Sequence, residues 1–143
     1  MRIAIVLSVV LVLGSGVIMS SALTAENQGT TSSTKIRALM EARQDVLKKR
    51  LAAFEFRLNQ GTTKPEIVFA ARKDLLKAEL AMASTKEERI VVLNKCIANA
   101  KENEKLASER LMVGTADASP TDLLFATAER LEVEIELVQD TAN

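Results

Sequence analysis

One six-residue pattern occurs twice in the chain, and each copy is followed by a proline and a segment with helical patterning. Residues 57–62 read RLNQGT, and residues 110–115 read RLMVGT. Pro65 and Pro120 follow them. An internal repeat of this kind indicates a duplicated supersecondary unit. The repeat therefore predicts two helical hairpins in series.

Four helices are expected, at residues 34–60, 65–83, 85–113 and 119–140. Ala, Leu, Glu, Lys and Arg dominate from residue 34 onward, and all five favour helices. Proline suits the first turn of a helix, as at Pro65 and Pro120. Glycine suits the position just past a helix end, as at Gly61 and Gly114. The predicted fold class is all-α: two tandem antiparallel helical hairpins, formed by four long helices with coiled-coil-like packing.

Apolar residues recur at steps of three and four along each expected helix, which predicts the faces that meet the core. The stripe of the first helix comprises Ile36, Met40, Leu47, Leu51, Phe54 and Leu58. That of the third comprises Ile90, Leu93, Ile97, Ala100, Ala107 and Leu111, and that of the fourth comprises Leu124, Ala128, Leu131, Ile135 and Val138. The four phenylalanines lie near the glycine turns, so we expect the turn-proximal end to be the better packed end.

The connection at Ser84-Thr85 has two interpretations. Thr85 and Glu88 have the spacing of a capping box, which marks a new helix start. A reversal there would place both glycine turns at one end of the molecule. Alternatively, one helix runs through these residues and the two turns lie at opposite ends of a longer rod. The capping box favours the reversal.

Residues 1–22 resemble a secretory signal peptide. Arg2 is followed by an apolar run from Ile3 to Leu13 and then by small residues at Ser20-Ser21-Ala22. The alternative is an uncleaved membrane anchor. Residues 23–33 are small and polar, which predicts a flexible linker. A helical hairpin domain is then expected at 34–139, with a tail at 140–143. The expected location is exported, either periplasmic or anchored in the membrane and facing the periplasm.

Composition argues against several classes of function. The chain has 19 basic and 19 acidic residues and no histidine. Balanced charge gives no general attraction to nucleic acid, and membrane contact is expected only through residues 1–22. Without histidine, no metal site of the usual transition-metal type is expected, and nothing indicates a cofactor or an enzyme. Cys96 is the single cysteine and is interpreted as a small core residue or, alternatively, as an intermolecular disulfide.

Other charged residues have structural interpretations. Glu132, Glu134 and Glu136 would fan over a wide arc of a helix, which is typical of a solvated face. Arg43 and Glu104 interrupt apolar stripes. They either extend to water or fix the register of the helices.

The two glycine turns are the candidate site. They could serve only to terminate helices. The alternative is a recognition tip, because capping by glycine does not by itself require the repeated Arg-Leu and Thr. On this hypothesis the partner contacts are Gly61, Thr62, Arg110, Val113, Gly114, Thr115 and Asp122.

These turns resemble those of the TolC family of outer-membrane efflux proteins. In that family long helices meet at turns of the form V-G-T-x-x-x-D-[VL]-L-x-A. Val113-Gly114-Thr115 opens this motif and residues 122–126 (DLLFA) close it two residues late. The first copy starts at Gly61-Thr62 and keeps the usual spacing, but it has Ile67 in place of the aspartate. The resemblance covers roughly residues 35–139.

The resemblance implies a periplasmic helical hairpin domain whose turns meet adaptor proteins. Members of the family are far longer and carry strands that build an outer-membrane barrel. No such strands are expected here, so this chain is not expected to form the channel itself. Our leading hypothesis is a non-enzymatic exported protein that acts through helix–helix interaction, or self-association, in an envelope transport or scaffold assembly. The alternative is a free-standing periplasmic chaperone or stress protein of helical hairpin type.

Overall fold

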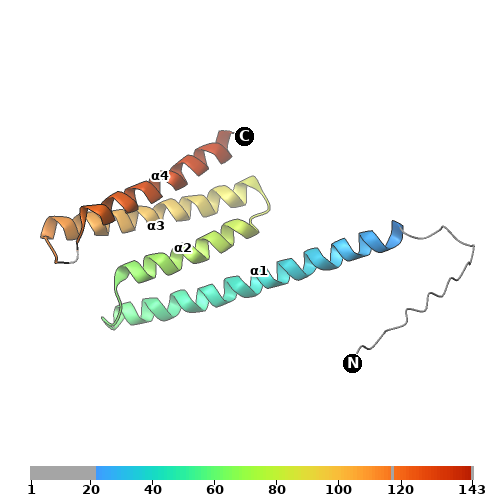
Figure 1. The fold of residues 1–143 in the computed structure, drawn as a ribbon, viewed down its shortest axis with the longest axis horizontal. Coiled ribbons are helices and arrows are strands. Elements are labelled where there is room, and N and C mark those ends of the chain that lie inside the picture. Colours follow the sequence, from blue (N-terminus) through green and yellow to red (C-terminus); the bar gives the residue numbers. More distant parts are fainter. Residues whose placement is uncertain (1–21, 117, 143) are drawn as a thin grey trace, which may run out of the picture. The chain divides into compact units, whose positions relative to one another are not determined.

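The computed structural model describes residues 22–116 and 118–142, with side chains described from residue 32 onward. These residues form four helices and no strand (Figure 1). The helices are α1 (Ala22–Asn59), α2 (Pro65–Met82), α3 (Lys86–Val113) and α4 (Pro120–Ala142). The predicted all-α class of two successive helical hairpins is confirmed.

The N-terminal part of α1 differs from the sequence-based expectation. Helix α1 begins at Ala22, so the segment predicted as a flexible linker, 23–33, is helical. No proline lies between residue 22 and the apolar-patterned part of α1, and Gly29 is the only glycine there. Helix propagation costs little once a helix has formed, so the helix extends toward the N-terminus through weakly helix-forming residues. The signal or anchor predicted at 1–22 lies almost wholly outside the described residues.

Residues 34–143 form a compact unit. In the described parts of the chain, 22–116 and 118–142, no helix is both long and apolar enough to cross a membrane.

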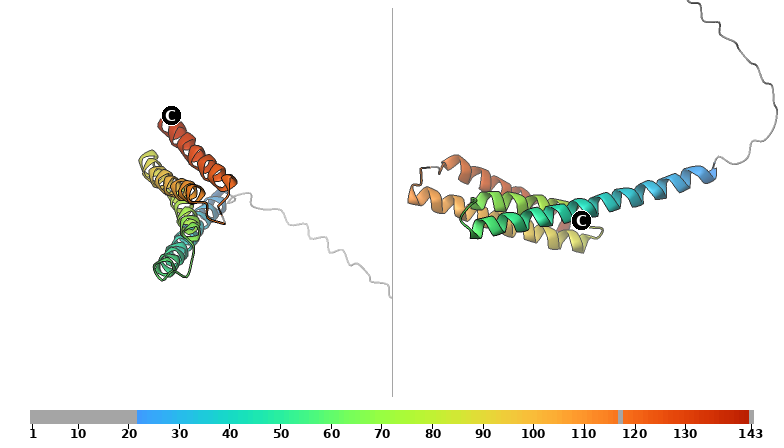
Figure 2. Two further views of the ribbon diagram at one scale, coloured as in Figure 1. Left: turned by 90° about the vertical axis from the view of Figure 1, so that its left-hand side faces the viewer. Right: turned by 90° about the horizontal axis from the view of Figure 1, so that it is seen from below.

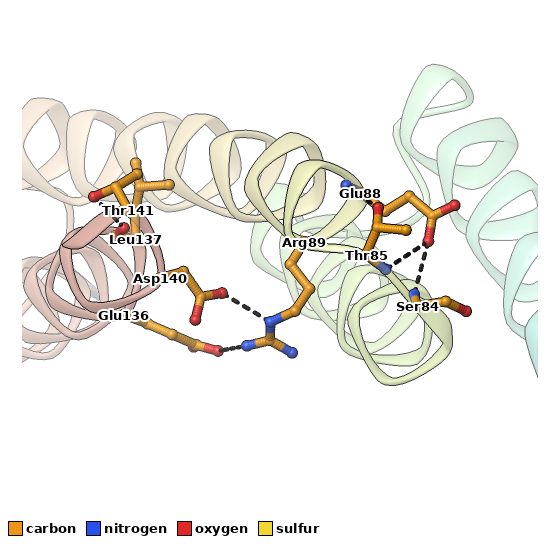
Figure 3. Close-up of polar contacts among 8 residues, drawn as sticks. All are labelled: Ser84, Thr85, Glu88, Arg89, Glu136, Leu137, Asp140 and Thr141. Atoms are coloured by element: carbon orange, nitrogen blue, oxygen red, sulfur yellow. Dashed lines mark hydrogen bonds and ion pairs between the residues drawn. The ribbon is translucent and has the colours of Figure 1, made fainter. Parts of the chain in front are cut away.

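The chain reverses at Ser84-Thr85, as the capping box predicted. The backbone N–H of Glu88 donates to Thr85 Oγ1 over 3.1 Å. Glu88 Oε2 in turn accepts from the N–H of Thr85 at 3.2 Å and from that of Ser84 at 2.7 Å (Figure 3). One carboxylate therefore satisfies two backbone donors that the helix start would leave unpaired. The reversal places both glycine turns at the same end of the unit (Figure 1).

The best buried side chains of the unit lie on α2 and α3. Leu93 is fully buried at 0% exposure. The other buried apolar residues of these two helices are Val68, Ala71, Leu75, Leu76, Ala78, Val92, Ile97 and Ala100. Leu93, Ile97 and Ala100 belong to the stripe predicted for the third helix, so this face is confirmed. Truncating a leucine in such a position to alanine typically costs about 2–5 kcal/mol.

The α3–α4 contact contains several ion pairs. Arg89 donates from Nε to Asp140 Oδ2 at 2.8 Å and from Nη2 to Glu136 Oε1 at 3.1 Å (Figure 3). Lys101 pairs with Glu134 at 3.6 Å. Ala126 is the one buried apolar residue among those of α4 that the structure describes. Ion pairs thus accompany most of this interface.

The face predicted to bury α4 is wrong. Leu124, Ala128, Leu131, Ile135 and Val138 are all exposed. Helix α4 instead meets α3 with the opposite face, on which Ala126 is buried and Arg130, Val133 and Leu137 are half-buried. The helix carries two apolar stripes, and spacing alone does not distinguish them. The stripe that packs on α3 is the one beside Thr127 and Arg130, which both bind Glu104 on α3.

Helix α1 is held to α2 by a half-buried stripe and two ion pairs. Met40, Leu47, Leu51, Phe54 and Leu58 are half-buried, whereas Ile36 is exposed. Arg50 on α1 binds Asp74 on α2 at 2.8 Å, and Arg72 on α2 reaches Glu55 on α1 at 3.4 Å. Arg72 also binds Glu102 on α3 at 2.9 Å, so one guanidinium links three helices.

Within residues 34–143 the helices follow one another in chain order when viewed end-on (Figure 2). Each outer helix therefore has a large solvent-facing side. Phe56 on α1 and Phe125 on α4 are 65% and 71% exposed. Phe54 and Phe69 are half-buried, so the phenylalanines near the turns are packed only in part. The better packing of the turn-proximal end stays a prediction.

Candidate functional site

The first glycine turn is a Schellman motif, a helix end closed by two specific backbone hydrogen bonds. Gly61 has φ +67°. Its N–H donates to Leu58 O at 2.9 Å, and the N–H of Thr62 donates to Arg57 O at 2.9 Å. The Thr62 hydroxyl donates to the same Arg57 carbonyl at 3.1 Å. Glycine is needed for the left-handed backbone, and threonine adds a second donor to a carbonyl that the helix leaves unpaired.

The second turn repeats this geometry atom for atom. Gly114 has φ +68°, and its N–H donates to Leu111 O at 3.2 Å. The N–H and hydroxyl of Thr115 donate to Arg110 O at 3.2 and 3.4 Å. Helix termination therefore accounts for the repeated Gly-Thr as well as for the glycine alone. Partner contact through Gly61, Thr62, Gly114 and Thr115 stays a prediction.

A groove of about 500 Å³ lies next to these turns, where residues of α2, α3 and α4 line it. Its lining comes from the start of α2, the second half of α3 and the start of α4. The residues that carry its chemistry are Glu66, Phe69, Asn99, Arg110, Asp122 and Phe125. This turn-end groove is the candidate site.

Two ion pairs border the turn-end groove. Arg110 on α3 pairs with Glu66 on α2, and Lys73 on α2 binds Glu129 on α4 at 3.0 Å. The second pair spans the groove from one wall to the other. Oε2 of Glu66 is buried and has no hydrogen-bond partner among the residues that the structure describes.

Asn99 is the most buried polar residue in the described parts of the chain, at 5% exposure. Its Nδ2 donates to Phe69 O over 3.3 Å. Its Oδ1 has no hydrogen-bond partner among the described residues. A buried acceptor without a donor costs about 1–3 kcal/mol. Asn99 and Glu66 both line the groove, and each has one buried acceptor oxygen without a donor among the described residues.

Apolar side chains stand at this end of the unit. Phe125 lines the groove and is 71% exposed, and Ile67, on the opposite wall, is 41% exposed. Met112 and Val113 precede the second turn and are each 78% exposed. Apolar side chains exposed beside a groove are typical of interaction sites.

The start of α4 is fixed by its own cap. Ser119 Oγ accepts from the N–H of Thr121 at 3.1 Å, and Ser119 O accepts from the N–H of Asp122 at 3.0 Å. The cap holds Asp122 in the first turn of the helix, where a carboxylate also suits the helix dipole. Asp122 lines the groove from this position.

The structure brings two of the predicted contact residues together and leaves the others apart. Arg110 and Asp122 line the turn-end groove, whereas Val113 is exposed beside the turn. The sequence patterns did not identify Asn99 or Glu66, because neither belongs to the repeated pattern. Phe125 was placed in the motif of the second turn, but it was expected to be well packed. No signal in the sequence distinguishes these residues from ordinary helix positions.

Glu104 and Cys96, which both lie outside the groove, have shifted pKa values. Hydrogen bonds from Arg130 and Thr127 hold the pKa of Glu104 below its ordinary range. Burial raises the pKa of the Cys96 thiol, which is therefore a poorer nucleophile than a free thiol. No group of His, Cys, Asp and Glu in the described parts of the chain could hold a metal ion.

Comparison of the chain with protein-family models, curated proteins and solved structures returned no match.

Proposed function

We propose that this chain is a non-enzymatic exported protein that binds another protein through helix–helix contact, as part of an envelope transport or scaffold assembly. The turn-end groove is the proposed docking site. The single observation that carries the proposal is Asn99, a side chain only 5% exposed whose Oδ1 has no donor among the described residues, at the base of a groove bordered by exposed Phe125.

The chemistry of the groove suits a helical segment that has apolar side chains and at least one hydrogen-bond donor. Phe125 and Ile67 offer apolar area, and burying a side chain of this size contributes about 1.5–3 kcal/mol. Asn99 Oδ1 and Glu66 Oε2 would accept from a hydroxyl, amide or ammonium group of the partner. Charges of both signs line the groove, from Lys64, Arg110, Asp122 and Glu129, and they favour a partner with mixed charge.

The TolC-like pattern of the turns is consistent with this proposal, since in that family the turns meet adaptor proteins. The second turn has the aspartate of the motif, Asp122, whereas the first has Ile67 in its place, and both residues line the groove. We therefore propose the second turn, rather than the first, as the one beside the partner. Export rests on the signal-like residues 1–22.

Affinity capture from the producing cells, with the captured proteins quantified by mass spectrometry, tests the proposal. Phe125→Ser should lose a specific partner that the native chain retains. Val91→Ser is the matched control, because Val91 is 56% exposed on α3 and does not line the groove. Equal recovery of all partners by both variants would count decisively against the groove.

A chaperone function is the second candidate, and the extent of exposed apolar surface favours it. Large exposed apolar side chains occur on every helix, including Ile36, Ile67, Val91 and Leu124. A protein with this function would suppress aggregation of an unfolded client at stoichiometric ratio. It would do so in the Phe125→Ser variant as well, because the surface is distributed.

A further inference from the structure

The two outer helices each carry an apolar stripe that no other described helix covers. On α4 this outer stripe is Leu124, Ala128, Leu131, Ile135 and Val138, all exposed. On α1 it is Leu39, Ala42, Val46, Ala53 and Phe56, also all exposed, with Lys49 in the remaining place. Both stripes follow the three- and four-residue steps of a coiled-coil seam. At 3.6 residues per turn, each lies roughly 150° around its helix from the stripe that packs within the chain.

The two outer helices have opposite charge. Helix α4 holds six Asp and Glu and one Arg, whereas residues 34–59 of α1 hold seven Lys and Arg and three Asp and Glu. Glu132 flanks the outer stripe of α4, Arg57 flanks that of α1, and Lys49 stands within the outer stripe of α1. None of these three side chains forms an ion pair with any residue that the structure describes. The stripes therefore match in pattern and are complementary in charge.

The same chain cannot bring its own two stripes together without breaking existing contacts. Helix α2 binds α1 through Arg72 and Asp74, and it binds α4 through Lys73. Successive residues are turned by about 100° around a helix axis. Arg72 and Asp74 therefore point about 100° to either side of Lys73, and the direction halfway between them is opposite to Lys73. Helices α1 and α4 are thus attached to opposite sides of α2.

We propose that copies of this protein associate side by side, with the outer stripe of α4 in one copy packed on the outer stripe of α1 in the next. At about 1.5 Å per residue the two stripes are about 21 and 26 Å long, so they match in length as well. Neighbouring helices within the chain are antiparallel, and an antiparallel α4–α1 contact between copies continues this alternation. The contact is heterologous, so it generates a closed ring or an open filament. It uses a different surface from the turn-end groove and does not depend on the proposed function.

Charge exchange between the two stripes tests the proposal. The first variant, Leu131→Lys with Glu132→Lys, makes the outer stripe of α4 basic. The second, Val46→Glu with Lys49→Glu, makes the outer stripe of α1 acidic. All four positions are exposed, so both variants should fold, and circular dichroism verifies this. Lys48→Glu is the matched control, because Lys48 is exposed on α1 away from its outer stripe.

Light scattering on the full chain gives the mass of each sample. For the native chain and for Lys48→Glu, the average molar mass should correspond to two or more chains. This mass should fall as the salt concentration rises. Each stripe variant alone should have the mass of one chain, and an equimolar mixture of the two should associate again. A native chain that stays single at all concentrations overturns the proposal. So does a variant that associates alone as the native chain does, because that result indicates a like-with-like contact instead.

Discussion

Arg130 on α4 donates from Nε to Oε2 of Glu104 on α3 over 2.7 Å. Glu104 Oε1 also accepts from the Thr127 hydroxyl at 2.7 Å, and Arg130 continues to Glu134 at 2.8 Å. The side chains of Glu104 and Arg130 are only 23% and 22% exposed. Because Thr127 and Arg130 lie on the same side of α4, Glu104 selects the face of α4 that meets α3.

Replacing Glu104 should weaken the α3–α4 contact. Glu104→Ala removes the acceptor of both Thr127 and Arg130, and we expect the free energy of unfolding to fall by about 1 kcal/mol, since partial exposure to water moderates the loss. Urea denaturation followed by circular dichroism measures this. Glu132→Ala, which removes a carboxylate without an ion pair in the described structure, should leave the unfolding free energy nearly unchanged. Equal losses in both variants would contradict the assigned role.

The contribution of Glu104 should depend on pH in a defined direction. Its pKa in the folded protein is held below its ordinary range by Arg130 and Thr127. The unfolded chain therefore binds the proton more readily, and stability rises with pH across this window. The stability difference between native protein and Glu104→Gln should be full above about pH 4.3, the ordinary value for glutamate. It should shrink as pH falls through the folded pKa, and a difference that grows in acid would refute this assignment.

Both turn glycines should be costly to replace by alanine. Gly61 and Gly114 have φ of +67° and +68°. An added Cβ would meet no atom within 4 Å at either position, so the cost comes from backbone strain alone. We expect Gly61→Ala and Gly114→Ala each to lose about 1 kcal/mol of unfolding free energy. Asparagine tolerates this conformation better, so Asn variants should lose less, and Asn variants as unstable as Ala would be inconsistent with this reason.

The capping box should govern the reversal between the hairpins. Thr85→Ala removes the acceptor for the Glu88 N–H and should cost about 1 kcal/mol in thermal or urea unfolding. Ser84→Ala is the matched control, because the Ser84 hydroxyl makes only a 3.4 Å contact with Met82 O. If the two variants unfold alike, the cap does not determine where α3 begins.

Cys96 should react slowly with thiol reagents. The thiol is half-buried and its pKa is raised, chiefly by burial. We expect a colorimetric thiol reagent to modify native protein much more slowly than unfolded protein at neutral pH, because less thiolate is present. Fast modification of the native chain, or a reducible dimer band on a gel, would instead support the intermolecular disulfide.

The sequence predicts helix ends well and helix faces poorly. Glycine at 61 and 114, proline at 65 and 120, and the Thr85–Glu88 box each act through bonds within a few residues, so local patterns located every reversal. The packed face of α4 depends on distant partners. Leu131 and Leu137 are equally apolar, and the position of Glu104 on another helix decides which one is covered.

The candidate site is predictable only in part, for the same reason. Arg110 and Asp122 were found because they accompany the repeated turn. In the sequence Asn99 is an ordinary polar residue of a helix. That its Oδ1 lacks a donor among the described residues follows from three-dimensional packing alone. The exposed state of Phe125 likewise depends on α4 having neighbours on one side only.

Photo-crosslinking in the producing cells shows whether the turn-end groove receives another protein. A photoreactive residue replaces Phe125 in one variant and Lys48, which lies away from the groove, in another. We predict a discrete covalent adduct with a second protein at position 125 and none at position 48. No adduct at position 125, or the same adducts at both positions, would contradict docking in the groove.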